Sequence, residues 1–158
     1  MSEIRREKTA CFTGHRPEKL SEHKDRIKER LNAAIDAAIE EGYDTFITGL
    51  ARGVDLWAGE MVLEKKKTNP SLSLIAAKPF DVFSVDWKEY SYIIENADEV
   101  FTATCNAEDT QSDEAYTTRD RWMVDNSSLV LAVYCGAEGG TKSTIEYANN
   151  MGVPVRYI

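Results

Sequence analysis

Residues 43–67 read YDTFITGLARGVDLWAGEMVLEKKK and hold three structural signals in one stretch. The first six residues form a compact run that predicts a buried strand, and a turn with two glycines follows it. Trp57 and Met61 then lie one helical turn apart, which predicts a helix over residues 54–67 that Pro70 prevents from continuing. Strand, glycine turn and helix together predict one β-α unit of an α/β sheet.

The same order of strand and helix recurs along the whole chain. Ser21 suits the N-cap of the first helix and Gly42 suits its stop. The alternation predicts a single α/β domain over residues 1–158, in which helices cover both faces of a mainly parallel sheet to give three layers. Expected strands cover residues 8–13, 43–48, 72–77, 99–103, 129–134 and 153–157. Expected helices cover residues 21–41, 54–67, 84–96, 113–126 and 143–150, and residues 105–112 are expected to be irregular.

The charge of the chain bears on its partners. Its 158 residues carry a formal net charge of −8. This acidic balance argues against broad binding to a nucleic-acid backbone, which needs a basic surface. A local basic pocket stays open, because total charge does not fix how charges are distributed. We therefore expect a small-molecule partner rather than nucleic acid, and we leave a homo-oligomer open.

The cysteines and the apolar runs bear on location. Cys11, Cys105 and Cys135 show no CxxC spacing. Cys11 and Cys135 lie within or just after apolar runs, where a thiol is expected to act as a small buried hydrophobe. The first residues lack an apolar stretch of signal-peptide length, and no apolar run is long enough to span a membrane. These features predict a cytoplasmic protein with reduced cysteines, and neither a metal nor a cofactor is expected.

Three glycine turns follow expected strands, at residues 13–16 (TGHR), 48–55 (TGLARGVD) and 136–144 (GAEGGTKST). Right-handed crossovers in a parallel sheet bring the carboxyl ends of its strands to one edge, which is where ligands bind. Free backbone N–H groups and the positive end of a helix dipole favour an anion at such a turn. The turns therefore predict a pocket for phosphate or ribose phosphate.

The first two turns supply candidate ligand-binding residues. In the first turn, the planar guanidinium of Arg16 suits a phosphate, and the alternative is an arginine on the surface. His15 either contacts the ligand or forms a hydrogen bond within its loop. In the second turn the glycines let the backbone approach a ligand closely. Its aspartate is expected to cap the next helix, with a ribose hydroxyl as the alternative partner. Neither turn matches the dinucleotide fingerprint GxGxxG. The candidates are Thr13, Gly14, His15, Arg16, Gly49, Arg52, Gly53 and Asp55.

The third turn offers glycines, hydroxyls and a lysine at an expected helix start, without the P-loop spacing GxxxxGK[ST]. Glu146 is expected in the first turn of that helix, where it either faces the pocket or only complements the helix dipole. Arg119 and Arg121 would add cations to the pocket, but the residues alone favour a solvated face of an amphipathic helix. The candidate phosphate ligands of this turn are Gly139, Gly140, Thr141 and Ser143.

Taken together, these segments resemble the SLOG superfamily, and most closely its YpsA-like branch. The resemblance rests on TGHRP at 13–17, TGLARGVD at 48–55, NAD at 96–98 and the block at 119–141. The second segment is similar to the SGxARGxD turn of DprA-type DNA-processing proteins. The last block is similar to that of the LOG phosphoribohydrolases, which cleave the N-glycosidic bond of cytokinin riboside monophosphates. The resemblance implies a Rossmann-like nucleotide-binding fold over nearly the whole chain.

The hydrolase pattern, RKxxM followed by a strand and PGGxGTxxE, is matched only in part. Arg119 and Glu146 match the arginine and glutamate that the resemblance implicates in catalysis, so these two are the candidate catalytic residues. Asp120, Glu138 and Lys142 replace the lysine, the proline and the third glycine of that pattern. Ser143 replaces its threonine, while Met123, Gly139 and Gly140 match. These departures favour binding over hydrolysis.

Three functions from different classes follow, in this order of preference. The first is a sensor or binding module for a nucleotide, or a ligand derived from one, at the carboxyl edge of the sheet. The second is a phosphoribohydrolase that cleaves a nucleoside monophosphate into base and ribose 5-phosphate. The third is a single-stranded DNA binder, which the charge of −8 disfavours. Aromatic side chains such as Trp57 and Trp122 are expected to pack in the core, whereas aromatics exposed together would indicate a dimer contact or a base-stacking surface.

Overall fold

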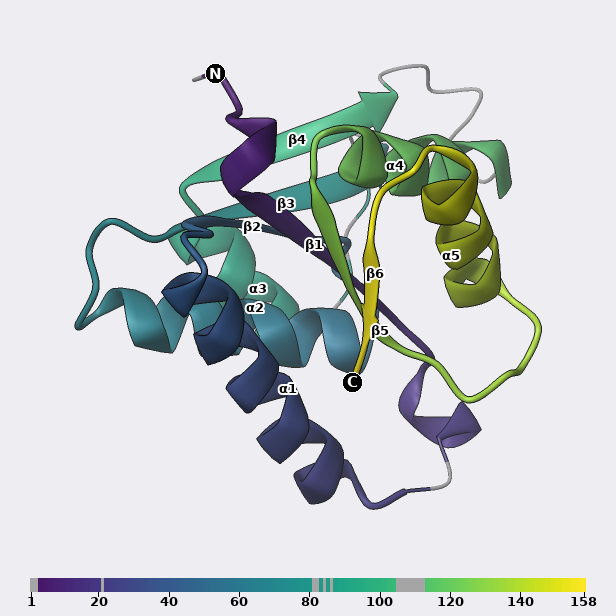
Figure 1. Cartoon of the computed structure of the whole chain (residues 1–158), viewed down its shortest axis with the longest axis horizontal. Coiled ribbons are helices and arrows are strands. Elements are labelled where there is room, and N and C mark those ends of the chain that lie inside the picture. The colour runs from purple at the N-terminus through teal and green to yellow at the C-terminus, as the bar shows by residue number, and fades with distance from the viewer. Residues whose placement is uncertain (1–2, 21, 81–82, 84, 86, 105–112) are drawn as a thin grey trace.

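The computed structural model describes residues 3–20, 22–80, 83, 85, 87–104 and 113–158, and its strands form one parallel sheet (Figure 1). The strands lie in the order β4-β3-β2-β1-β5-β6. Short apolar strands such as LVLAV in β5 are buried on both faces, as a parallel sheet between helices requires. The strands are β1 (Thr9–Gly14), β2 (Thr45–Thr48), β3 (Ser73–Phe80), β4 (Glu99–Thr104), β5 (Leu129–Val133) and β6 (Val155–Tyr157).

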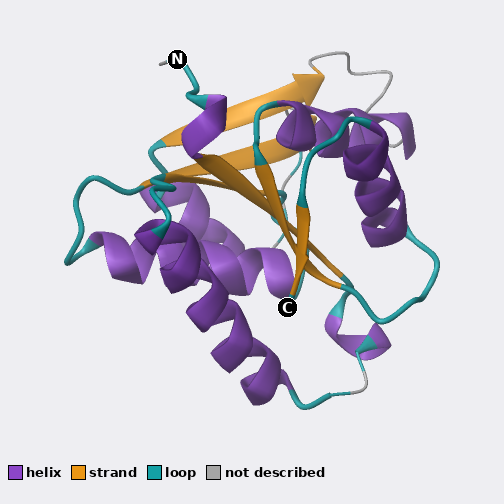
Figure 2. Ribbon diagram, in the orientation of Figure 1, coloured by secondary structure: helices purple, strands orange, loops and turns teal. Residues whose placement is uncertain are grey.

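Helices cover both faces of this sheet, which makes three layers (Figures 1 and 2). On one face lie α1 (Lys24–Glu40), α2 (Val54–Lys66) and α3 (Lys88–Asn96), and on the other lie α4 (Asp113–Asp125) and α5 (Gly140–Asn150). Two short 3-10 helices, η1 (Arg6–Lys8) and η2 (Pro17–Lys19), flank β1. The predicted α/β three-layer, Rossmann-like fold is confirmed. None of the described helices is both long and apolar enough to cross a membrane.

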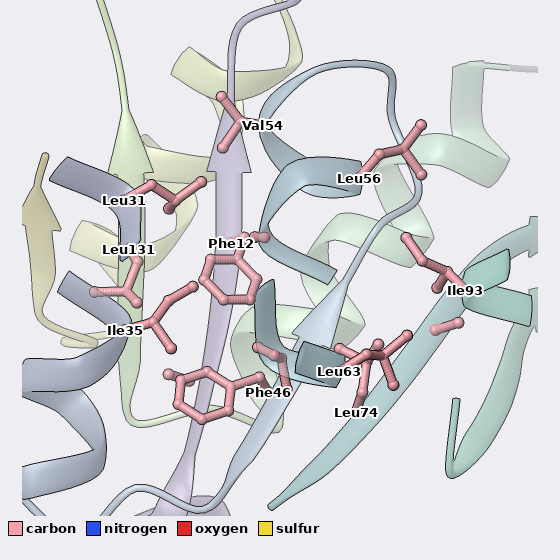
Figure 3. Close-up of a cluster of buried hydrophobic side chains, with 14 of the residues drawn as sticks. Phe12, Leu31, Ile35, Phe46, Val54, Leu56, Leu63, Leu74, Ile93 and Leu131 are labelled. Carbon is pink, nitrogen blue, oxygen red and sulfur yellow. The ribbon is translucent and has the colours of Figure 1, made fainter. Parts of the chain in front are cut away.

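Alternate residues of each central strand feed two separate hydrophobic cores. Cys11 and Phe12 are neighbours in β1, so their side chains lie on opposite faces of the sheet. Phe12 stacks on Phe46 with ring centroids 5.9 Å apart, in the core that α1, α2 and α3 cover. Figure 3 shows these two rings between Leu31, Ile35 and Leu131 on one side and Leu63, Leu74 and Ile93 on the other.

The core on the other face is smaller and is covered by α4 and α5. It contains Cys11, Val130 and Ala132 of the sheet, packed against Met123 and Ile145. Burial raises the pKa of the Cys11 thiol to about 12, so this cysteine is a small apolar core residue, as predicted.

Cys135 differs from that expectation, and Cys105 lies outside the described residues. The thiol of Cys135 is exposed, so the prediction of a buried thiol is wrong there. The reason is that β5 ends at Val133, which places Cys135 in the following loop.

Several boundaries differ from the sequence prediction. The helix expected from residue 143 begins three residues earlier, because Gly139 takes a φ of +138° and lets the chain enter a helix at Gly140. The helix expected from residue 21 begins at Lys24. His23 is its N-cap and accepts a hydrogen bond from the Asp25 N–H at 3.2 Å, whereas Ser21, the predicted cap, lies outside the described residues.

Two further boundaries shift around β3 and α3. Strand β3 continues beyond its expected end at residue 77, through Pro79 to Phe80. It pairs with β4 at Lys78 and Phe80, and so tolerates the missing N–H of the proline between them. The helix expected from residue 84 begins at Lys88, with Trp87 at its N-cap.

The strand order fixes where a ligand can bind. From β1 the chain moves outward through β2, β3 and β4, and then returns to pair β5 with the free side of β1. The loops that follow β1 and β5 therefore leave the sheet in opposite directions, with Gly14 opposite Val133 in the ladder. In an open parallel sheet, this switch point at the carboxyl edge is the usual ligand site.

Candidate functional site

The first and second glycine turns pack directly against each other at the carboxyl edge. A Cβ atom on Gly14 would lie 2.6 Å from the Val54 side chain, and one on Gly53 would lie 2.7 Å from Cδ of Pro17. Both positions therefore need glycine because the two loops touch there. Between the same loops, the guanidinium of Arg52 pairs with the Glu18 carboxylate at 2.6 Å.

The first and third turns also meet. Nζ of Lys19, the last residue of η2, donates a hydrogen bond to the Glu138 carbonyl oxygen at 3.2 Å. The Cys135 thiol donates to the Lys19 carbonyl oxygen at 3.3 Å. The ammonium group of Lys19 also lies 3.2 Å from the point where a Cβ on Gly139 would stand. This lysine therefore holds its charge beside the start of α5.

The start of α5 is exposed to solvent and has no side-chain cap among the described residues. Gly139 is its N-cap, and no described side chain makes a capping hydrogen bond there. Gly139 and Gly140 are both exposed, whereas Thr141 is buried and Ser143 exposed. The first N–H groups of a helix have no partner within it and carry the positive end of its dipole. With Lys19 alongside, this helix start has the chemistry of a phosphate site.

A buried arginine ties the second turn to α4. Arg119 is only 6% exposed, and its guanidinium donates hydrogen bonds to the carbonyl oxygens of Gly49 and Ala77, the latter at 3.4 Å. Its Nε donates to Asp120 at 2.7 Å, and the other oxygen of that carboxylate lies 3.9 Å from a Cβ built on Gly140. A single helical turn of α4 therefore connects the second turn with the start of α5.

The prediction of a solvated arginine face on α4 is wrong for one of its two arginines. Arg121 is exposed and lies over the Tyr147 ring at 5.1 Å, as a surface arginine does. Arg119 points the other way because the carbonyl oxygens of Gly49, just after β2, and of Ala77, within β3, accept its hydrogen bonds. Sequence spacing alone does not report those acceptors.

Asp55 does not cap α2, contrary to the sequence prediction. The helix begins at Val54 with Gly53 as its N-cap, so Asp55 already lies inside the first turn. Its Oδ2 accepts a hydrogen bond from the Ala51 N–H at 3.3 Å, within its own loop. Burial raises the pKa of Asp55 to about 7, although Arg119 acts to lower it. The carboxyl group is therefore poised to change its charge near neutral pH.

His15 is buried at the end of β1. Its ring stacks on Tyr134 with centroids 5.2 Å apart, and its backbone N–H donates to the Val133 carbonyl oxygen at 3.2 Å. Burial lowers the pKa of His15, and the charge of Lys19 lowers it further, which favours the neutral imidazole.

Two buried side-chain atoms at this edge have no hydrogen-bond partner. They are Nε2 of His15 and Oδ1 of Asp55, and within the described part of the chain no other buried side-chain nitrogen or oxygen shares this state. Their residues are 3% and 7% exposed. His15 directly follows β1, and Asp55 lies in the first turn of α2, the helix that follows the neighbouring strand β2. Buried polar atoms are normally paired, so two orphaned atoms on neighbouring turns indicate partners that the described part of the chain does not supply.

Other predicted residues stand apart from this arrangement. Arg16 is exposed, Arg52 is engaged by Glu18, and Thr13 is buried in β1. Glu146 lies in the second turn of α5 rather than the first, because the helix begins earlier than predicted. Its side chain is 61% exposed, and its ion pair is with Lys142 at 3.9 Å. The two candidate catalytic residues are thus held by different partners.

Three contributors were not identified from the sequence. Lys19 is the last residue of the short helix η2, which begins at Pro17. A proline at the first position of a helix was the available signal for this turn, which brings Lys19 to the carboxyl edge of the sheet. Tyr134 and Asp120 gave no signal of their own, because their roles depend on His15 and Arg119 being buried beside them.

Comparisons with known proteins agree with this architecture. The family model YpsA, described as the YspA SLOG family, matches residues 10–154. UPF0398 proteins of Bacillus thuringiensis (strain Al Hakam) and Bacillus cereus (strain AH187) are each 30% identical over 157 residues, covering 92% of this chain and 84% of theirs.

Two solved structures share the fold. DNA processing protein A from Helicobacter pylori, described for its single-stranded DNA binding mode, superposes with a TM-score of 0.72 at 16% identity over 94% of this chain. DNA processing protein A from Streptococcus pneumoniae gives a TM-score of 0.72 at 17% identity over 96% of this chain. The matches span 64% and 50% of those two longer chains.

Proposed function

The chain belongs to the YpsA family of SLOG proteins, and on that premise we propose that it binds a nucleotide, or another ligand carrying ribose phosphate, at the carboxyl edge of its sheet. It acts there as a sensor or binding module. The observation that carries the proposal is the pair of orphaned buried atoms, Nε2 of His15 and Oδ1 of Asp55, on two turns that pack against each other.

The phosphate belongs at the start of α5. Gly139 and Gly140 leave the first backbone N–H groups of the helix accessible, and Lys19 adds a positive charge beside them. The exposed hydroxyl of Ser143 and the exposed guanidinium of Arg16 are further donors on the third and first turns.

The sugar belongs next to the orphaned atoms. A ribose hydroxyl both donates and accepts, so it can pair with an imidazole nitrogen and with a carboxyl oxygen in either protonation state. Such contacts would satisfy His15 and Asp55 at once, and the energy otherwise lost by burying them unpaired would favour the bound state.

Ligand binding tests the proposal directly. Isothermal titration with AMP, ADP-ribose, NAD and ribose 5-phosphate should detect at least one ligand. Lys19→Ala should then weaken binding about tenfold, as expected for loss of a charge-assisted hydrogen bond. Lys67→Ala is the matched control, because Lys67 is an exposed lysine at the opposite end of α2. No binding to any of the four compounds would end the proposal.

Hydrolysis of an N-glycosidic bond is the second candidate, and one observation favours it. A carboxyl group with a pKa of about 7 suits general acid catalysis, and Asp55 has that value beside the proposed sugar site. Chromatography of nucleoside monophosphates incubated with the protein should show released base if this candidate is right. Turnover must then fall in Asp55→Asn or Glu146→Ala, and no release of base from any common nucleotide would exclude it.

Binding of single-stranded DNA is the third candidate, favoured by the likeness to DNA processing protein A. The net charge of −8 opposes it. Fluorescence anisotropy with a labelled oligothymidylate distinguishes the candidates, because binding to a DNA backbone weakens steeply as salt rises. Absence of measurable binding at low salt would rule DNA out.

A further inference from the structure

Three aromatic rings gather beside the proposed ligand site, and we call Phe80, Phe83 and Tyr116 the aromatic wall. The Tyr116 ring lies 6.1 Å from that of Phe80 and 6.5 Å from that of Phe83, and it stands nearly perpendicular to both. Phe83 also meets the ring of Tyr90, whose hydroxyl donates to the Phe83 carbonyl oxygen at 2.9 Å. Tyr90 therefore holds the aromatic wall against α3.

The aromatic wall adjoins the buried arginine of the site. Phe80 ends β3, the strand next to β2, and Tyr116 lies one helical turn before Arg119 on α4. Figure 1 shows α4 beside the ends of β3 and β4. The guanidinium of Arg119 lies over the Tyr116 ring at 5.6 Å, while the same group reaches the Gly49 carbonyl oxygen. One side chain thus links the glycine turn to the wall.

The wall keeps an aromatic surface accessible. Tyr116 is 38% exposed, although it belongs to a cluster of aromatic side chains. Both phenylalanines meet its ring in a T-shaped arrangement, and the Arg119 guanidinium lies over the same ring. Because more than a third of Tyr116 is exposed, part of this residue is open to a flat ligand group. Stacking on aromatic side chains is the usual way in which proteins hold an unpaired base, because every base presents a flat face.

We propose that the aromatic wall stacks the nucleobase of the bound ligand, so that the site selects nucleotides over simple sugar phosphates. This inference rests on the proposed function, since it assumes that phosphate and ribose occupy the turns. The wall contributes preference for an aromatic base, while Lys19 and the start of α5 hold the phosphate. A preference for one base over another is not needed, because stacking tolerates all of them.

The test compares ligands that differ only in the base. Affinities for AMP, UMP and ribose 5-phosphate are measured with the wild-type chain, Tyr116→Ala and Tyr116→Phe. Loss of one stacked base should weaken AMP binding about 5- to 150-fold in Tyr116→Ala and leave ribose 5-phosphate unchanged. Tyr116→Phe keeps the ring and should bind AMP like the wild type.

Tyr92→Ala is the matched control. Tyr92 lies on α3 and is 41% exposed, close to the 38% of Tyr116. It lies near Lys67, which follows the carboxyl end of α2, away from the glycine turns. Its removal should leave all affinities unchanged. Thermal melting of each variant separates loss of the ring from loss of the fold.

The remaining outcomes each overturn the inference. Equal weakening of AMP and ribose 5-phosphate would assign Tyr116 to placing Arg119 rather than to the base. Weakening of oligothymidylate binding alone would make the wall a DNA surface, and a change in oligomeric state with unchanged affinities would make it a dimer contact. If ribose 5-phosphate binds and AMP binds no better, only this inference fails. If the wild type binds neither, the proposed function fails with it.

Discussion

The two sides of the carboxyl edge of the sheet are built in opposite ways. On the side of β2 and α4, Arg119, Asp55 and Asp120 form a charged cluster whose first two members are less than a tenth exposed. On the side of α5, the side chains of Glu146 and Lys142 are 61% and 38% exposed, and they pair with each other across one helical turn. The same kinds of side chain thus lie in a nearly dry environment on one side and in solvent on the other.

This difference separates buried charged side chains that hold the fold together from exposed ones that water can solvate. Within the buried cluster Arg119 donates hydrogen bonds to two backbone carbonyl oxygens and to Asp120, so a change there should disturb the fold of the edge itself. On the exposed side, water replaces any lost partner, and changes there should act only through a ligand. Stability measurements on single variants can therefore test whether the two sides differ as their burial implies.

Removal of the buried arginine should give the largest effect. Arg119→Met keeps much of the apolar stem but leaves two carboxyl groups without their cation and two carbonyl oxygens without a donor. The free energy of unfolding, measured by urea denaturation, should fall by about 3–5 kcal/mol. Arg121 lies two residues further along α4 and is exposed, so Arg121→Met should change the free energy of unfolding little. Equal effects of the two variants would contradict the structural role of Arg119.

The pH dependence of stability should reveal Asp55. Its pKa is raised from the ordinary 3.8 to about 7, with Arg119 and Asp120 as its charged neighbours, so in that window the folded protein holds a proton that the unfolded chain releases. The stabilisation is full below pH 3.8 and is lost as the pH rises toward 7.

Asp55→Asn retains the shape of the protonated side chain and removes its titration. The free energy of unfolding of this variant, relative to the wild type, should rise by about 3 kcal/mol from the lower to the upper end of the window. Asp36→Asn, which alters an exposed carboxylate on α1, controls for the loss of one charge. If the wild type and Asp55→Asn gave parallel pH profiles, the pKa of Asp55 would be the same in the folded and unfolded chains, which would contradict the raised value.

Two glycines with nearly the same positive φ allow the cost of backbone strain to be measured apart from the cost of crowding. Gly53 and Gly136 have φ of +95° and +94°, but a Cβ would strike Pro17 at the first and meet nothing within 4 Å at the second. Gly136→Ala should cost about 1–2 kcal/mol of stability from the left-handed backbone alone. Gly53→Ala should cost about 1–3 kcal/mol more, because its loop must move away from the first turn. Equal costs would mean that the two turns do not need their close contact.

The smallest effect is expected at Glu146. Glu146→Gln removes one carboxylate from the exposed side, where its ion pair with Lys142 is long and solvated. The urea midpoint should not change measurably. A clear loss of stability would place this glutamate among the structural residues and weaken the distinction between the two sides.

Local sequence patterns predicted the fold because the strands are short, apolar and regularly separated by helices. Turns that follow strands necessarily share one edge of a parallel sheet, so the gathering of the three glycine turns followed from topology alone. The roles of Asp55 and Arg119 did not follow, because both depend on where α2 begins and on which carbonyl oxygens face α4. The aromatic wall was also beyond reach, since Phe80 and Tyr116 come from separate elements that meet only in the folded chain.

The central place of β1 has a consequence for how the chain folds as it is synthesised. One side of β1 pairs with β2 soon after both strands emerge, but the other side waits for β5, with Gly14 opposite Val133. Until residues 129–133 have left the ribosome, an apolar strand edge is open to other chains, and pairing across so long a loop is slow. Aggregation of nascent chains should therefore be greatest just before β5 appears, and the edge proposed to hold the ligand is completed by the same event that closes the sheet.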